Sequence, residues 1–127
     1  MTNQDVISYW QVGSDDAFDT ATTLLKTNKY HHALFFCHLA LEKQLKARIV
    51  SDSKTNPPPI HNLLQLATHT SLKLSPEQKE QLREINSFNI EARYDDYKLR
   101  FYKKATVEYA NNWYTITKDI LIWLKKK

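Results

Sequence analysis

The fold of this chain is decided by residues 30–50, which read YHHALFFCHLALEKQLKARIV. The stretch contains no Gly or Pro, and its apolar residues recur at steps of three and four, a spacing that places them on one side of an α-helix. Examples are Tyr30, Leu34, Cys37, Leu41 and Leu45. At about 1.5 Å per residue this helix is about 30 Å long. Its wide apolar stripe predicts a central helix around which others pack.

The same helix carries a narrow line of polar residues. His38, Glu42 and Lys46 follow one another at steps of four, and Lys43 lies beside them. Side chains one turn apart can interact, so we expect an exposed ionic pair between His38 and Glu42. Two ligands without a third do not make a zinc site, and the chain lacks the Glu-x-x-His pairs of di-iron bundles. We therefore predict no metal.

Composition favours one all-α domain, residues 1–127. The chain has one Gly and four Pro, three of them adjacent, so a few long helices with short connections suit it best. The single Cys37 excludes an internal disulfide and suits a reducing cytoplasm. No signal peptide and no membrane span is expected, which predicts a cytoplasmic protein. The net charge of +4 permits phosphate-bearing partners and supports nucleic acid weakly.

Four further helical segments surround the central one. The first has apolar residues along one face, and a proline-rich loop follows the central helix after Val50. Ser75, Pro76 and Gln78 form the N-cap, first position and capping box of a later helix. These segments span residues 5–27, 60–67, 75–88 and 105–127. We assemble the chain as an up-and-down four-helix bundle with an additional short helix.

The segment between residues 86 and 104 has no clean period and is rich in aromatic and charged residues. Arg93 offers a planar fork for a phosphate, and Tyr94 and Tyr97 offer flat surfaces for a base. Asp95 and Asp96 suit a ribose hydroxyl or a cation. The alternative is structural: Arg93 pairs with a local acid and the tyrosines cap the bundle, as is common for ion pairs.

Four motifs in this order resemble the HEPN domain, named for higher eukaryotes and prokaryotes nucleotide-binding. The central helix reads Y-x-x-A-x-F-x-C-x-x-A-x-E-K-x-L-K-A from Tyr30 to Ala47. Trp10 and the segment 16–24 precede it. A proline-rich loop then leads into His61-Asn62-Leu63-Leu64-Gln65-Leu66, and Ala92-Arg93-Tyr94 follows with an acid after it. The resemblance covers nearly the whole chain.

The resemblance implies a bundle of four or five helices that commonly forms homodimers, with kinship to the helical domain of kanamycin nucleotidyltransferase. Small members are often encoded beside a minimal nucleotidyltransferase, as paired or toxin–antitoxin-like systems. Two activities are attributed to the family, nucleotide binding and metal-independent RNA cleavage. Members that cleave RNA carry an Arg followed four to six residues later by His.

This sequence departs from the cleavage motif. The positions where His would follow Arg93 hold Lys98, Leu99 and Arg100, and all five histidines lie upstream. Without an imidazole there, the acid–base step lacks its agent, and Lys98 is a poor general base unless its pKa is strongly lowered. We therefore expect no catalytic residues.

The sequence thus predicts a non-catalytic nucleotide-binding module that forms a homodimer, works with a nucleotidyltransferase partner and needs no metal or other cofactor. The first candidates for the nucleotide or phosphate site are Arg93, Tyr94, Asp95, Asp96 and Lys98. Second candidates, which match the central helix or follow the proline-rich loop, are His38, Glu42, Lys43, Lys46 and His61.

Two alternatives stay open. The first is an RNA-cleaving toxin that uses an unusual constellation around Arg93, Lys98 and Arg100. The second is a purely structural dimer whose interface buries Trp113, Trp123 and tyrosines.

Overall fold

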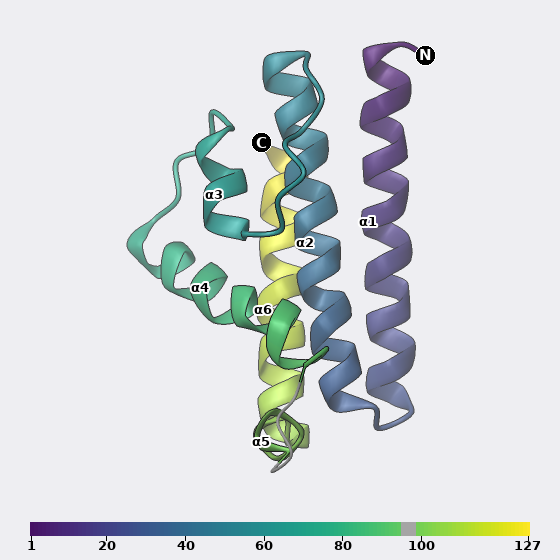
Figure 1. The fold of residues 1–127 in the computed structure, drawn as a ribbon, viewed down its shortest axis with the longest axis vertical. Coiled ribbons are helices and arrows are strands. Elements are labelled where there is room, and N and C mark those ends of the chain that lie inside the picture. The colour runs from purple at the N-terminus through teal and green to yellow at the C-terminus, as the bar shows by residue number, and fades with distance from the viewer. Residues whose placement is uncertain (95–98) are drawn as a thin grey trace.

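Helices account for most of the chain. The computed structural model describes residues 1–94 and 99–127, and in these it contains six helices and no strand (Figure 1). The four longer ones are α1 (Asn3–Lys26), α2 (Tyr30–Ser53), α4 (Pro76–Glu91) and α6 (Val107–Lys126), and the two short ones are α3 (Leu63–Thr68) and α5 (Arg100–Lys104). The prediction of an all-α helical bundle is confirmed.

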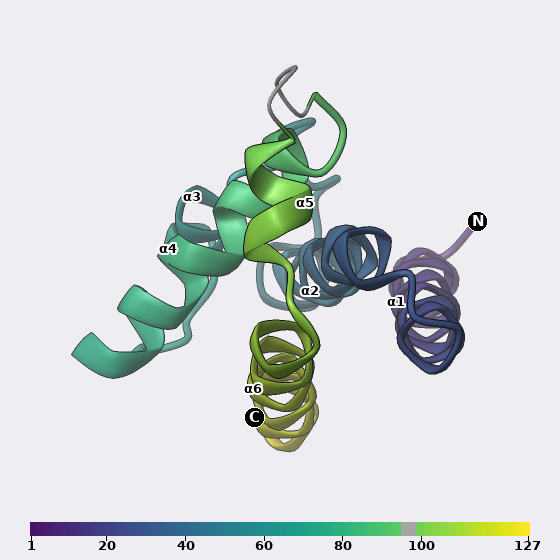
Figure 2. The ribbon, with the colours of Figure 1, turned by 90° about the horizontal axis from the view of Figure 1, so that it is seen from below.

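The central position of α2 is also confirmed. It packs against every other helix, and more than half of its 24 residues are buried. Figures 1 and 2 show α1 and α6 on different sides of α2, with α3 and α4 on a third side. The long helices alternate in direction along the chain, but α4 is inclined across α2 and not aligned with it (Figure 1). The other helices therefore pack around α2, which occupies the centre of the bundle.

Most predicted helix boundaries hold closely, but α1 and α2 are longer than predicted, α3 begins three residues later, α4 ends three residues later, and the short α5 was not predicted. The Ser75 side chain accepts a hydrogen bond from the Gln78 backbone, and the Gln78 side chain accepts one from Ser75, which completes the predicted capping box. A second capping box, at Thr2 and Asp5, starts α1 two residues earlier than predicted. Helix α2 continues three residues past Val50, because the polar residues there are compatible with a helix and Pro57 is the first that is not.

The core is built on the apolar residues of α2. Leu34, Leu41 and Leu45 are buried and lie in one cluster with Ile85 and Phe88 of α4. Cys37 is buried as well, and burial raises the pKa of its thiol to about 12. It is therefore the core residue that the sequence predicted and not a reactive thiol.

No helix in the part of the chain that the structure describes is both long enough and apolar enough to cross a membrane.

Candidate functional site

A network of ionisable side chains lies between α2 and the loop that precedes α3. The Glu42 carboxylate is its centre: one oxygen, Oε2, accepts a hydrogen bond from Lys46 Nζ at 2.9 Å and lies 2.9 Å from His61 Nδ1. Glu42 and Lys46 are each only 5% exposed. His38, the predicted partner of Glu42, is fully buried, so the prediction of an exposed ionic pair between these two residues is wrong. The loop after α2 runs back along the helix and covers this face (Figure 1).

His38 holds the loop in place. Its ring is fully buried, and its Nε2 lies 3.0 Å from the backbone oxygen of His61. A carbonyl oxygen only accepts, so Nε2 of His38 carries the proton and donates it. Burial lowers the pKa of His38, although the charge of Glu42 opposes this shift. The residue is a neutral donor that positions the His61 backbone.

His61 is the one member of the network that faces solvent. Its side chain is 60% exposed, and its Nδ1 points at the Glu42 carboxylate. A carboxylate accepts hydrogen bonds, so Nδ1 carries the proton and Nε2 is left as the acceptor on the outer side of the ring. The two residues are 19 apart in the chain, so no spacing along one helix could have indicated this contact. A carboxylate-oriented imidazole of this kind can take up a proton from a bound molecule.

Lys46 is held from a second side by α1. Its ammonium nitrogen lies 5.2 Å from the centre of the Trp10 ring, a distance at which the ring attracts a cation. Lys43, the neighbouring candidate, does not join the network. Its stem crosses α1 at Gly13, where a Cβ would lie 3.0 Å from Lys43 Cδ. The only glycine of the chain is therefore placed where a lysine side chain passes closely over a helix.

Arg93 lies just beyond the end of α4, and its side chain is exposed. The central carbon of its guanidinium is 5.9 Å from the Phe35 ring centre and 5.3 Å from that of Tyr94. Within residues 1–94 and 99–127, no carboxylate lies at ion-pair distance from it. The other three first candidates, Asp95, Asp96 and Lys98, lie outside the described residues, as does Tyr97.

The Arg93 group and the Glu42 network occupy the same side of α2. Phe35 and Glu42 are seven residues apart, which is close to two full turns, so both point the same way at about 10 Å along the helix axis. No contact joins Arg93 directly to His61 or Glu42 among the described residues. The Arg93 group and the Glu42 network therefore lie on one face of α2 as two separate groups. Across the described residues, no cluster of His, Cys, Asp and Glu could hold a metal ion.

The model of the HEPN domain family matches residues 7–127, which is nearly the whole chain. The chain belongs to the HEPN family. Comparison with curated proteins gave no match, and neither did comparison with solved structures. The family inferred from the four sequence motifs is therefore confirmed. The HEPN domain covers nucleotide-binding and RNA-cleaving functions.

One polar contact of this HEPN chain was missed at the sequence level. Tyr109 of α6 donates its hydroxyl proton to the Glu84 carboxylate of α4, and Lys104 Nζ lies 3.2 Å from the same group. Burial and the neighbouring Glu84 charge raise the pKa of Tyr109 well above its usual value. The three residues lie on different helices, so no spacing along the chain could have indicated the contact. The contact between Tyr109 and Glu84 joins α6 to α4 and is a structural link between these helices.

The buried ion pair should show strong coupling in a double-mutant cycle. Lys46→Met leaves the Glu42 carboxylate buried without its ammonium partner and should lower the free energy of unfolding by about 3–5 kcal/mol. Adding Glu42→Gln removes the stranded charge, so the double variant should lose much less than the two single variants combined. Urea unfolding at neutral pH measures this. Lys43→Met, on the same helix but outside the network, is the control and should change stability little; strictly additive losses would show that the pair is not coupled.

Burial of neutral His38 should make stability depend on pH below neutrality. The folded-state pKa lies below the ordinary value of 6.5, so the unfolded chain takes up a proton first as the pH falls. Stability should be fully present above about pH 6.5 and fall below it, by up to about 1.4 kcal/mol per pH unit. Urea unfolding between pH 8 and 5 tests this. His38→Gln should flatten the profile and the exposed-site control His69→Gln should not; equal slopes in all three proteins would refute the assignment.

Proposed function

We propose that this HEPN chain is a non-catalytic nucleotide-binding module and that Arg93 binds the phosphate. The observation that carries this proposal is the placement of the guanidinium beside the Phe35 and Tyr94 rings, with no carboxylate partner in the described chain. Contact with aromatic rings engages the faces of a guanidinium and leaves its N–H edges available. Those edges match the geometry of a phosphate, which a lysine at the same place would not reproduce.

The aromatic ring beside Arg93 supplies the second half of a nucleotide site. Tyr94 is 69% exposed, so its ring is open for stacking with a base. Stacking on aromatic rings is a common way of holding unpaired bases and tolerates different bases. Asp95, Asp96 and Lys98 follow directly in the sequence and remain proposed contacts for the ribose and the phosphate.

We propose further that the module acts as a homodimer together with a nucleotidyltransferase partner. Membership of the HEPN family supports both parts of this proposal. Exposed apolar side chains on the outer surfaces of α1 and α6, Tyr9, Val12 and Ile122 among them, supply area that a second protein chain can cover.

Nucleotide binding should depend on Arg93. Thermal shift against ATP, GTP, CTP, UTP and the four monophosphates should show stabilisation by at least one ligand, about 2.7 kcal/mol when it is present at 100 times its Kd. Arg93→Ala should abolish this and Arg93→Lys should retain only part of it, because lysine keeps the charge but not the fork.

The matched control is Arg83→Ala, since Arg83 of α4 is also exposed but pairs with Glu80. It should bind like the wild type. If no nucleotide stabilises the wild type, or if Arg93→Ala responds fully, the proposal fails.

RNA cleavage is the second candidate, and the contact between His61 and Glu42 is the observation that favours it. In this reaction the 2′-hydroxyl of a ribose attacks the adjacent phosphorus, a cyclic phosphate forms and the 5′-oxygen leaves. His61 Nε2 would take the 2′-hydroxyl proton, Glu42 would stabilise the resulting imidazolium, and the imidazolium would give that proton to the leaving 5′-oxygen. His61 would then take the place of the histidine that is missing after Arg93.

Cleavage of a labelled single-stranded RNA in the presence of EDTA tests the second candidate. If the activity exists, His61→Gln should slow it by about 100-fold or more, while His69→Gln should leave it unchanged. Absence of cleavage by the wild type removes this candidate and leaves the binding proposal intact. Cleavage that persists in His61→Gln assigns the chemistry to other residues.

A further inference from the structure

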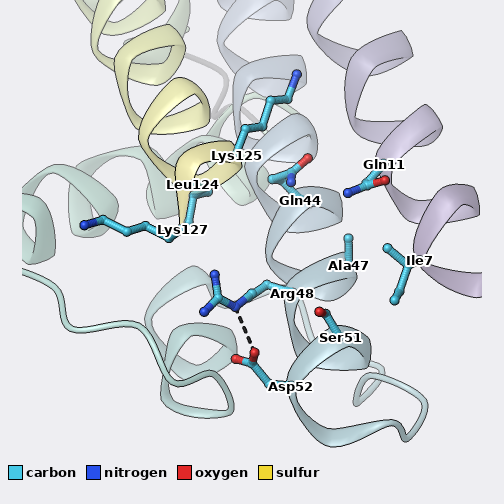
Figure 3. A pocket seen from close by; sticks show the side chains of 10 residues that line it. All are labelled: Ile7, Gln11, Gln44, Ala47, Arg48, Ser51, Asp52, Leu124, Lys125 and Lys127. Atoms are coloured by element: carbon cyan, nitrogen blue, oxygen red, sulfur yellow. Dashed lines mark hydrogen bonds and ion pairs between the residues drawn. The ribbon is translucent and has the colours of Figure 1, made fainter. Parts of the chain in front are cut away.

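A polar cavity of about 290 Å³ lies where the C-terminal end of α6 meets α1 and α2 (Figure 3). On α2 it is lined by Gln44 and by the small residues Ala47 and Ser51, one and two turns further along, whose short side chains leave the space open. Gln44 and Glu42 are two residues apart, which on a helix is more than half a turn, so the cavity faces away from the Glu42 network. It is a separate place on the molecule.

The Gln44 side chain is the feature that singles out this cavity. The residue is 5% exposed, and its amide oxygen is buried without a hydrogen-bond partner among the described residues. Buried amides are normally paired, so an unpaired one in a cavity wall indicates a partner from outside the chain. Since a carbonyl oxygen only accepts, that partner is a hydrogen-bond donor. Half a turn about the last bond of the side chain exchanges the oxygen and the nitrogen, so the oxygen can face a donor in the cavity.

The charged side chains around the cavity already have partners. Arg48 Nε donates to Asp52 Oδ1 at 2.9 Å, a carboxylate of α1 lies 2.9 Å from Lys125 Nζ, and Lys127 Nζ lies 5.7 Å from the centre of the Trp123 ring. A bound anion would therefore compete with the existing partners of these cations. A bound cation would meet three positive side chains and one carboxylate among the described lining residues. The charges favour a neutral ligand.

The other polar groups of the cavity are neutral as well. Gln11 on α1 and Ser51 on α2 line it, and neither side chain is hydrogen-bonded to another described residue (Figure 3). Amides and hydroxyls both donate and accept, so a ligand hydroxyl, which also does both, can pair with each of them. Ile7 and Leu124 add apolar surface. A molecule with several hydroxyl groups and an apolar C–H face matches this lining.

The volume limits the size of the ligand. About 290 Å³ is at the small end of ligand pockets and suits one sugar ring but not an oligosaccharide. It is also far larger than the share of about 30 Å³ that one water molecule has in the liquid, so a single water bound to Gln44 would leave most of the cavity unfilled.

We propose that this cavity binds a neutral polyhydroxylated molecule of the size of one monosaccharide. One hydroxyl donates to the Gln44 amide oxygen, and others exchange hydrogen bonds with Gln11 and Ser51. The C–H face of the ligand contacts Ile7 and Leu124. This site does not depend on the nucleotide site proposed at Arg93.

NMR of the ¹⁵N-labelled full chain tests the proposal with ribose, glucose and myo-inositol, and with inorganic phosphate, acetate and methylammonium as charged probes. At least one polyol should shift the side-chain amide signals of Gln44 and the backbone signals of Ala47 and Ser51 in a saturable way, and no charged probe should. Gln44→Leu should weaken binding by about tenfold, read from the backbone signals, because it removes the acceptor. The control Gln65→Leu replaces an exposed glutamine of α3 outside the cavity and should bind like the wild type.

Thermal unfolding is measured in parallel. Gln44→Leu replaces an unpaired buried amide with an apolar side chain of similar size and is expected to fold. Gln11→Leu, at an exposed position of α1, should also weaken binding and decides the question if Gln44→Leu unfolds. The proposal is overturned if no polyol shifts these signals, if a charged probe shifts them as well, or if the folded Gln44 and Gln11 variants bind like the wild type. It is also overturned if the polyol shifts signals around Arg93 instead, because the ligand then occupies the other face.

Discussion

The burial of residues 33–50 of α2, each of them buried or half-buried, is the constraint on which the rest of the structure depends. The polar side chains that are buried there cannot reach water, so each of these needs a partner inside the protein. Glu42 has Lys46 and His61, and His38 has the backbone oxygen of His61. Gln44 has none. The Glu42 network is where the buried polar groups of this helix find partners, and the Gln44 amide oxygen is where one does not.

The Glu42 network shows how a structural requirement can produce a reactive geometry. A buried carboxylate is costly unless it is paired, and two partners converge on one of its oxygens. One partner, Lys46, is buried and serves stability. The other, His61, is exposed, and its outer nitrogen is available because its inner one is occupied by Glu42. The same carboxylate therefore pairs with a buried ammonium and orients an exposed imidazole.

Arg93 depends on a different kind of support. It has no described ion partner, and its neighbours are the rings of Phe35 and Tyr94. Aromatic contacts orient a guanidinium without neutralising it, whereas a carboxylate partner would compete with a phosphate. The position of Phe35 on α2 places this group on the side of the helix that also carries Glu42. The chain belongs to the HEPN family, which covers nucleotide-binding and RNA-cleaving functions.

The sequence by itself determined the all-helical class, the central role of residues 30–50, the capping box at Ser75 and the HEPN family. The first three follow from local physics, because helical periodicity, the conformational limits of proline and the hydrogen bonds of a helix end act between residues close in the chain. The family followed from the resemblance of four motifs in order. Tertiary structure alone decided that Glu42 and Lys46 are buried, that His61 reaches Glu42, and that Gln44 and Arg48 share a cavity. The spacing of four residues showed that His38, Glu42 and Lys46 lie along one line of the helix. It did not show which segment of the chain covers that line. Burial and pairing depend on which distant segment folds over a helix face, and spacing along that helix carries no information about it.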